Sequence, residues 1–246
     1  IEFDHVTFVY PDGEEPVLQD VSFKANKGEM IAFIGSTGSG KSTLVNLVPR
    51  FYDVSSGSIK INGKDIRDYD VLELRDKLGV IPQKAVLFSG TIADNIRFGK
   101  KDASDEEVEY AAKVAQAYPF IMEKENGFDE EISEGATNVS GGQKQRLSIA
   151  RALVRKAQIY IFDDSFSALD FKTDAILRKE LKKEMTESIM LVVAQRISSI
   201  MEADQIIVLN EGKVVGKGTH HQLLKECQIY HEIATSQLSE EELANA

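Results

Sequence analysis

The sequence predicts an α/β fold: a sheet of parallel strands surrounded by helices, a small antiparallel β layer, and a helical subdomain inserted into the core. Short apolar runs between helical patterns indicate the parallel sheet, alternating segments near the start of the chain indicate the β layer, and a capped helical stretch indicates the insert. With 42% hydrophobic residues, the 246-residue chain can bury a core large enough for one large or two small domains.

The antiparallel layer comes first along the chain. Residues 1–10 and 17–24 alternate between apolar and polar, and residues 58–61 do the same before the turn pair Asn62-Gly63. Alternation places one face of each strand against a core, and Asn-Gly is a common hairpin turn. We expect residues 1–28 and 57–70 to form this layer.

The core strands are almost continuously apolar, which is typical of strands buried on both faces of a parallel sheet. They are residues 30–34, 78–81, 159–162 and 189–194. Residues 103–124 have a helical pattern instead, and Ser104 and Glu107 are spaced as a capping box at its start. We therefore expect a helical insert over about residues 84–150 and a core built from the remainder.

The first core strand leads into a glycine-rich loop and then into a helix that starts near Lys41. The loop is a complete phosphate-binding P-loop, Gly35-Ser36-Thr37-Gly38-Ser39-Gly40-Lys41-Ser42. Its backbone N–H groups and the positive end of the helix dipole can surround phosphates. We expect Lys41 to reach the β- and γ-phosphates of ATP, Ser42 to offer its hydroxyl to Mg²⁺, and Thr43 to lie beside them. The core is predicted to be a RecA-like P-loop NTPase.

Polar side chains gather where the other core strands end. They are Gln83, the pair Asp163-Asp164, and Gln195. In an open α/β sheet, ligands bind beyond the carboxyl ends of the strands, so these groups can converge on one nucleotide. An acidic pair after a strand is by itself more often a helix cap than a metal site. The whole constellation favours a Mg²⁺ ligand.

A second phosphate-binding device, the turn Val139-Ser140-Gly141-Gly142-Gln143, opens another helix. Its Ser hydroxyl, N–H groups and dipole favour an anion, and its glycines let a phosphate carried by another chain approach. Ordinary N-capping also uses a serine, but a cap does not need two glycines. Because one nucleotide should not need both devices, we expect each ATP to lie between the P-loop of one chain and this turn of a second chain.

These motifs resemble the nucleotide-binding domain of ATP-binding cassette (ABC) transporters, of the exporter type in which it follows a transmembrane domain. The resemblance covers nearly the whole chain and extends to residues 86–96 and 218–220. The matching positions are Tyr10 for the aromatic residue that stacks on adenine, Gln83 for the Q-loop, residues 139–143 for the signature motif, Asp163 for the Walker B aspartate, and Ser167, Ala168, Leu169 and Asp170 for the D-loop.

The resemblance implies a role for each motif. Asp163 and Ser42 would hold the Mg²⁺ shell, and Gln83 would present its amide to the metal or to the attacking water. The signature motif would bind the γ-phosphate of ATP carried by the partner's P-loop. The implied partners are a second nucleotide-binding domain and the transmembrane domains, which we expect to press against residues 83–96.

Departures from the family pattern concern the terminal phosphate. Active members have a glutamate directly after the Walker B aspartate, where this chain has Asp164, and a switch histidine where it has Gln195. The carboxylate is one methylene short, and glutamine cannot carry imidazolium charge. We expect Asp164, Gln195 and Gln83 to form a catalytic group that hydrolyses ATP slowly. This pattern resembles the degenerate-site half of a heterodimeric exporter whose partner has both groups intact.

Other functions stay open at this point. A homodimeric exporter ATPase would need a competent Asp164, and a nucleotide-binding regulator of this family would have no transport role. A chromosome-type ATPase would carry a long coiled-coil insertion, and a translation-associated member would carry a second cassette; the sequence has neither.

Composition bounds the partners and the location. The formal net charge of −11 disfavours a nucleic-acid partner, and the single cysteine, Cys227, excludes an internal disulfide and suggests a reducing compartment. No apolar run approaches the roughly 20 residues that span a bilayer, and no signal peptide is seen. We expect a transmembrane domain outside this chain to hold it at the cytoplasmic face of the membrane.

The pair His220-His221 is interpreted as a surface helix start rather than a metal site, and residues 239–246 as solvated or partly helical.

Overall fold

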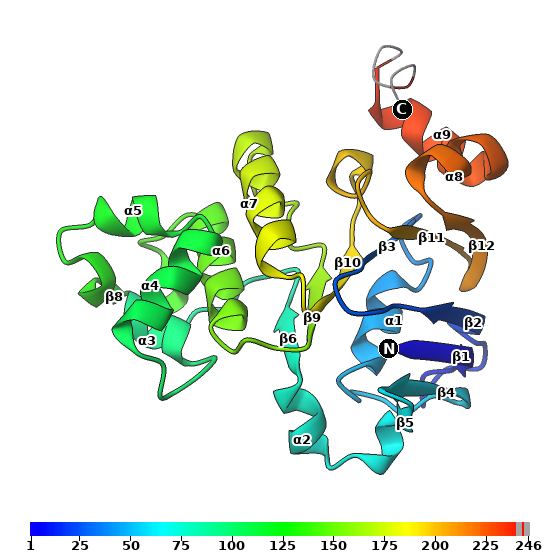
Figure 1. Ribbon diagram of the computed structural model, residues 1–246, viewed down its shortest axis with the longest axis horizontal. Helices are drawn as coiled ribbons and strands as arrows, with labels where there is room; N and C mark the ends of the chain where they lie inside the picture. Colours follow the sequence, from blue (N-terminus) through cyan, green and yellow to red (C-terminus); the bar gives the residue numbers. More distant parts are fainter. Residues whose placement is uncertain (240–242, 244–246) are drawn as a thin grey trace.

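The computed structural model describes residues 1–239 and 243 (Figure 1). Within these residues the core is a six-stranded sheet of order β12-β11-β3-β10-β9-β6, in which only β11 and β12 pair antiparallel. Its strands are β3 (Met30–Gly35), β6 (Leu78–Ile81), β9 (Ile159–Asp163), β10 (Ile189–Val193), β11 (Gln205–Asn210) and β12 (Lys213–Gly218). The predicted α/β fold class is confirmed.

The strands predicted from apolar runs, β3, β6, β9 and β10, are neighbours in this sheet. Because they run parallel, their carboxyl ends meet along one edge. The sequence reasoning missed β11 and β12, although β11 is also a buried apolar run. The turn between them, Glu211-Gly212, has positive φ angles of 48° and 76°, which is the backbone of a tight hairpin.

The antiparallel sheet has the order β2-β1-β4-β5 within the described residues. Its strands are β1 (Glu2–Phe8), β2 (Leu18–Lys24), β4 (Ser56–Ile61) and β5 (Lys64–Asp65). Phe23 stacks on Phe3 with ring centroids 4.4 Å apart and meets Phe33 of the core sheet edge-on at 5.3 Å. Helix α1 (Lys41–Leu47) buries its apolar side in the same cluster, so both sheets hold the helix that follows the P-loop.

The helical insert projects from the core at the left of Figure 1 and contains α3 (Ile92–Arg97), α4 (Asp105–Val114), α5 (Tyr118–Met122) and α6 (Gly141–Leu153). The short strands β7 (Gly90–Thr91) and β8 (Glu131–Ile132) pair beside them. Ser104 and Glu107 form a reciprocal capping box at the start of α4. The stretch expected at residues 103–124 is divided into α4 and α5, because Pro119 fits only in the first turn of a new helix.

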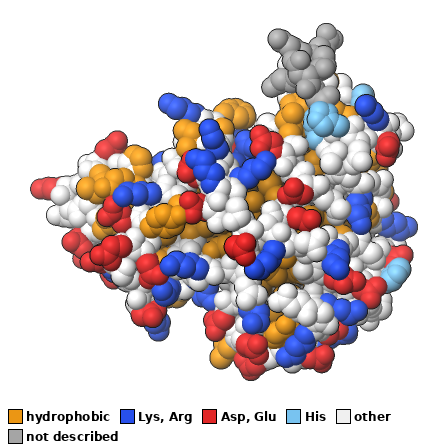
Figure 2. Space-filling view, viewed as in Figure 1, with side chains coloured by type: hydrophobic (Ala, Val, Ile, Leu, Met, Phe, Trp, Pro, Cys, Tyr) orange, Lys and Arg blue, Asp and Glu red, His pale blue; other side chains and the backbone are white. Residues whose placement is uncertain are grey.

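The remaining helices cover the sheets. They are α2 (Val71–Asp76), α7 (Phe171–Glu184), α8 (His220–Glu226) and α9 (Gln228–Gln237), together with the short 3-10 turns at Ile66–Asp68, Gly127–Asp129, Glu134–Ala136 and Ile197–Ser199. In the described part of the chain, no helix is long and apolar enough to cross a membrane. Figure 2 shows hydrophobic side chains exposed over the insert and basic side chains interspersed with acidic ones.

The C-terminal expectations have different outcomes. His220 does begin a helix, but the expectation that it lies on the surface is wrong, because it is buried and its Nδ1 lies 2.7 Å from the Tyr230 hydroxyl. This hydrogen bond offsets part of the lost solvation, and burial lowers the pKa of the imidazole. Most of the acidic tail, residues 239–246, lies outside the described residues.

Candidate nucleotide-binding site

A cavity of about 780 Å³ opens at the carboxyl edge of the core sheet, and we call it the nucleotide cavity. It brings together groups that follow four different strands. Its lining includes Gly35, Ser36, Thr37, Gly38, Gly40, Lys41, Ser42, Thr43, Gln83, Asp164 and Gln195, and also Val17, Asn210 and one face of α9. The convergence expected for these scattered residues is therefore present in the tertiary structure.

Positive φ angles shape the P-loop between β3 and α1. Gly38 and Gly40 have φ values of 81° and 98°, a region that L side chains rarely adopt. At Gly40 a Cβ would also lie 2.8 Å from the Leu18 side chain and 3.0 Å from the Val17 carbonyl oxygen. The loop therefore needs glycine where it passes β2.

The Lys41 ammonium is folded into the P-loop. It donates to the carbonyl oxygens of Gly35 and Ser36, both at 2.8 Å, and to the Ser39 hydroxyl at 3.3 Å. Burial lowers the pKa of Lys41, while Asp164 and Asp163 act in the opposite direction. A triphosphate can replace these neutral carbonyl acceptors with charged oxygens, which form stronger hydrogen bonds with an ammonium.

Ser42 and Asp163 meet at the start of α1 and the end of β9. The Ser42 hydroxyl donates to Asp163 Oδ1 at 2.8 Å. Burial raises the pKa of Asp163, opposed by this hydrogen bond and by Lys41. A hydroxyl and a carboxylate in contact are the hard oxygen ligands that Mg²⁺ prefers, and a nearby cation would favour the ionised carboxylate. The residues present therefore fit the ion. In the described residues, no cluster of three or more His, Cys, Asp or Glu side chains offers an all-protein metal site.

Asp164 is the centre of a hydrogen-bonded group that forms part of the cavity lining. Its Oδ2 accepts from Gln83 Nε2 at 3.0 Å and from Gln195 Nε2 at 2.6 Å. Burial raises the pKa of this carboxyl, the Gln83 hydrogen bond opposes the shift, and the neighbouring Asp163 reinforces it. The expected catalytic trio is therefore together, but the Gln83 amide faces Asp164 rather than the Ser42–Asp163 pair.

Tyr10 lies at the edge of the site. Its hydroxyl is 2.9 Å from Thr43 Oγ1, and its ring packs edge-on against Phe8 and Tyr52 with centroids 4.8 and 5.1 Å away. Thr43 lines the nucleotide cavity, whereas Tyr10 is not part of the lining. The residue is placed beside the P-loop helix, and stacking on a purine stays a prediction.

The signature motif, Val139 to Gln143, is not part of the cavity lining. Ser140 caps α6: its hydroxyl accepts from the Gln143 N–H at 3.2 Å, and Gln143 Oε1 accepts from the Ser140 N–H at 3.0 Å. A Cβ on Gly141 would point into open space. Capping therefore uses the serine, but it leaves open space beside Gly141 at the helix tip.

The D-loop connects the signature motif to Asp164. A Cβ on Gly142 would lie 3.3 Å from the Ala168 carbonyl oxygen, so the two motifs approach closely. Ser167 donates to the Asp164 carbonyl oxygen at 2.8 Å. Leu169 is buried, and Asp170 caps α7 by accepting from the Thr173 N–H at 2.9 Å.

The sequence reasoning missed the part of the cavity that α9 supplies. Its lining residues are Ile229, Glu232, Ile233, Ser236 and Gln237. Their spacing marks one face of a helix, which is a signal in the sequence, but only the tertiary structure places that face opposite the P-loop.

Comparison with known proteins assigns the family. Residues 18–167 match the profile of the ABC transporter family. The chain belongs to this family. It is similar to an uncharacterized ABC transporter ATP-binding protein of Mycobacterium tuberculosis, with 47% identity over 94% of this chain and 40% of that protein. A putative multidrug export ATP-binding/permease protein of Staphylococcus aureus is 44% identical over 96% of this chain and 41% of that protein.

A solved structure of this ABC family agrees with the fold. A bacterial Atm1-family ABC exporter with ATP bound superposes with a TM-score of 0.92 and 38% identity, over 97% of this chain and 42% of that one. The resemblance to an ABC exporter nucleotide-binding domain, including a P-loop NTPase core, is confirmed. The chain spans about 40% of the length of the curated ABC relatives that it matches.

Proposed function

We propose that this chain is the ATP-binding, energy-coupling domain of an ABC exporter. The site built on its own P-loop binds MgATP and hydrolyses it slowly. The observation that carries the proposal is the group around Asp164. A shortened carboxylate and two glutamine amides occupy the end of the cavity where the family has a glutamate and a histidine. On this proposal the whole chain is a single nucleotide-binding domain.

Binding is assigned to the P-loop side of the nucleotide cavity. Lys41 and the N–H groups of residues 36–43 hold the phosphates, and Ser42 and Asp163 would hold Mg²⁺, which offsets phosphate charge when bound. Tyr10 carries the adenine from its place beside Thr43. None of these roles needs a second chain, so the isolated chain is expected to bind ATP.

Slow hydrolysis follows from the geometry of Asp164. Its Oδ2 already accepts from two amides, and its backbone is held in place because its N–H donates to the Val193 carbonyl oxygen at 3.0 Å. A carboxylate fixed in this way and one methylene short is poorly placed to orient an attacking water. Gln195 is neutral, so it supplies no positive charge to stabilise the charge that develops on the phosphate in the transition state.

The binding part of the proposal has a direct test. Lys41→Ala should weaken ATP binding by the isolated chain about 30-fold, because a charge-assisted hydrogen bond to phosphate contributes about 2 kcal/mol. Lys213→Ala, which removes an exposed lysine on β12, is the matched control and should leave the Kd unchanged. Titration calorimetry with MgATP measures both. Equal affinity of the two variants would refute the assigned cavity.

The signature motif is assigned to the partner's nucleotide. Its absence from the lining of this chain's own cavity, and the open space around Gly141, support a role in trans. The proposed partner is a non-identical nucleotide-binding domain with an intact glutamate and histidine. An exporter with two copies of this chain is the alternative, and it requires Asp164 to be competent; a regulator without a transport role is the other.

Coupling to a transmembrane domain is assigned to a groove of about 310 Å³ between the core and the insert. We call it the docking groove; its apolar lining includes Phe51, Leu72 and Phe98, which are 52%, 72% and 61% exposed. The occupant proposed is an intracellular end of the transmembrane helices, because the longer relatives include one named ATP-binding/permease. On this proposal the chain works at the cytoplasmic face of a membrane.

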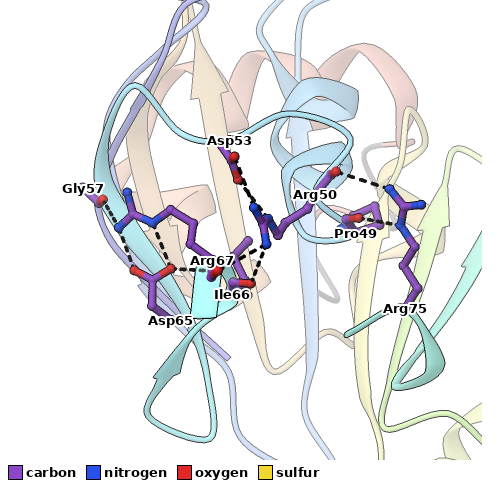
Figure 3. Close-up of polar contacts among 8 residues, drawn as sticks. All are labelled: Pro49, Arg50, Asp53, Gly57, Asp65, Ile66, Arg67 and Arg75. Atoms are coloured by element: carbon purple, nitrogen blue, oxygen red, sulfur yellow. Dashed lines mark hydrogen bonds and ion pairs between the residues drawn. The ribbon is translucent and has the colours of Figure 1, made fainter. Parts of the chain in front are cut away.

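Arginines hold both walls of the docking groove. On the core side, Arg75 donates to the carbonyl oxygens of Pro49 and Arg50 at 3.0 and 3.3 Å, and Arg50 pairs with Asp53 at 2.9 Å (Figure 3). On the insert side, Arg151 donates to the carbonyl oxygens of Val86 and Asn95 at 2.7 and 2.8 Å.

Phe98, which lines the docking groove, packs against Phe88 of the segment that starts at the Q-loop. Phe88 and Phe98 pack with ring centroids 4.5 Å apart, and the Arg151 guanidinium lies 5.1 Å from the Phe88 ring. Gln83 lies in the nucleotide cavity at the other end of this segment. On this proposal residues 83–96 connect the nucleotide cavity along the chain to Phe98, the first residue after them that lines the docking groove.

Removing one aromatic side chain tests the docking groove. Phe98→Ala should weaken binding of this chain to vesicles that carry the transporter's transmembrane domain about 10-fold, since a central aromatic contact contributes more than 1 kcal/mol to an interface. Tyr110→Ala is the matched control, because Tyr110 is 52% exposed on α4 but outside the groove. Sedimentation with vesicles, corrected for vesicles without the domain, gives both values. Similar losses in the two variants would argue against the groove.

A further inference from the structure

Helix α9 forms one wall of the nucleotide cavity with a single face. The residues of that face, Ile229, Glu232, Ile233, Ser236 and Gln237, recur every three to four positions. The opposite side of the helix buries Ala234 in the same core cluster as Ile197 and Ile200, which lie just after β10. The helix is thus fixed in the core while its other face borders the cavity.

Gln237, the last residue of α9, holds the loop that carries Gln195. Its Nε2 donates to the Gln195 carbonyl oxygen at 2.8 Å, and its Oε1 accepts from the Ile197 N–H at 2.8 Å. A carboxamide suits this position because a neutral side chain must donate and accept at once. The backbone on both sides of Arg196 is therefore tied to α9.

The tied loop contributes Gln195 to the cavity lining and contacts the D-loop. The Gln195 side chain donates to Asp164 Oδ2 at 2.6 Å. Arg196 donates to the Ser167 carbonyl oxygen at 3.2 Å, and its guanidinium lies 4.8 Å from the Phe171 ring. A shift of the loop would move both contacts, so Gln237 constrains groups that it does not touch.

We propose that Gln237 is a positioning residue that orients the Gln195 loop for the terminal phosphate of ATP. The proposal rests on the function proposed above, in which this cavity binds the triphosphate. ADP lacks the terminal phosphate, so a residue that acts through Gln195 affects ATP binding and leaves ADP binding unchanged. Helix α9 thereby contributes to discrimination between the two nucleotides.

The test compares the two nucleotides in the full chain. With Mg²⁺ present, Gln237→Ala should raise the Kd for ATP about threefold to fivefold, the loss expected for one net hydrogen bond, and leave the Kd for ADP unchanged. In a Gln195→Ala background, Gln237→Ala should cause no further loss, because the group through which it acts is gone. Titration calorimetry measures each Kd.

Control variants separate positioning from a structural effect. Thr235→Ala removes a hydroxyl that donates to the His231 carbonyl oxygen within α9, and it should change neither Kd. Gln237→Glu keeps the acceptor for the Ile197 N–H, whereas Gln237→Ala removes it. Hydrogen exchange at this amide should therefore become faster in the alanine variant and stay slow in the glutamate variant.

The outcomes separate the two proposals. Equal losses for ATP and ADP, additive losses in the double variant, or unchanged exchange at Ile197 would overturn the positioning role while leaving the nucleotide site intact. If the wild-type chain bound no ATP, the proposed function would fail first, and the positioning role with it. The positioning role is supported if Gln237→Ala weakens binding of ATP but not of ADP, and if it causes no further loss in the Gln195→Ala background.

Discussion

Replacing Asp164 by Glu and Gln195 by His together should raise the steady-state ATP turnover of this chain about 100-fold, because orientation of the attacking water accounts for a factor of that order. The added methylene lets the carboxylate reach toward the cavity instead of ending against the Gln83 amide, 3.0 Å from its Oδ2. The histidine removes the second amide, which is 2.6 Å from the same oxygen. It also provides a group that can carry positive charge.

Phosphate release at saturating MgATP, with single and double variants side by side, measures this effect. Each single variant should gain less than the double, because Gln195 donates to the Asp164 carboxylate and the effects of the two substitutions are coupled. Adding Lys41→Ala to the double variant should return turnover to background, which places the gain in this P-loop. Wild-type turnover equal to that of the repaired chain would contradict the degenerate-site proposal and favour a competent Asp164.

Ser140→Ala should lower turnover about 100-fold when it is introduced into the repaired chain, and the loss should occur in the site of the partner. Removing one donor aimed at charge that develops in the transition state costs a factor of this order. Ser140 lies outside the lining of its own cavity, so an effect within the same chain has no direct route. The repaired chain serves as its own partner in this experiment.

Mixing two inactive variants shows where the signature motif acts. The first is the repaired chain with Ser140→Ala, and the second is the repaired chain with Lys41→Ala. Each should be inactive alone, whereas a mixture should regain turnover, since the P-loop of the first chain meets the signature motif of the second. Turnover should rise with the square of chain concentration while dimers are scarce. A mixture as inactive as its components would exclude action in trans.

Much of the candidate site was predictable because its chemistry is local in sequence. The P-loop needs glycine at positions with positive φ, such as Gly38 and Gly40, and a lysine directly afterwards, so one contiguous segment defines it. The capping box of Ser140 and Gln143 is likewise a spacing of three residues. The apolar runs that became β3, β6, β9 and β10 indicated which polar residues would follow a strand.

Other features depended on contacts between distant segments. Gln83 was expected to present its amide to the metal or to the attacking water. In the structure the amide donates to Asp164, a contact that spacing in the sequence does not decide. His220 was expected on the surface, but α9 covers it and Tyr230 supplies its hydrogen bond. The split between α4 and α5 was not predicted, although Pro119 is a signal for it in the sequence.

The sequence by itself determined the family, the fold class and the identity of the phosphate-binding groups, because these follow from local backbone requirements and from periodicity. Only the tertiary structure decided that Asp164 accepts from two amides, that the signature motif lies outside the lining of its own cavity, and that Gln237 ties α9 to the Gln195 loop. These hydrogen bonds join residues 31, 42 and 81 positions apart in the sequence, and they arise from packing of whole elements. No pattern within a short window records that packing.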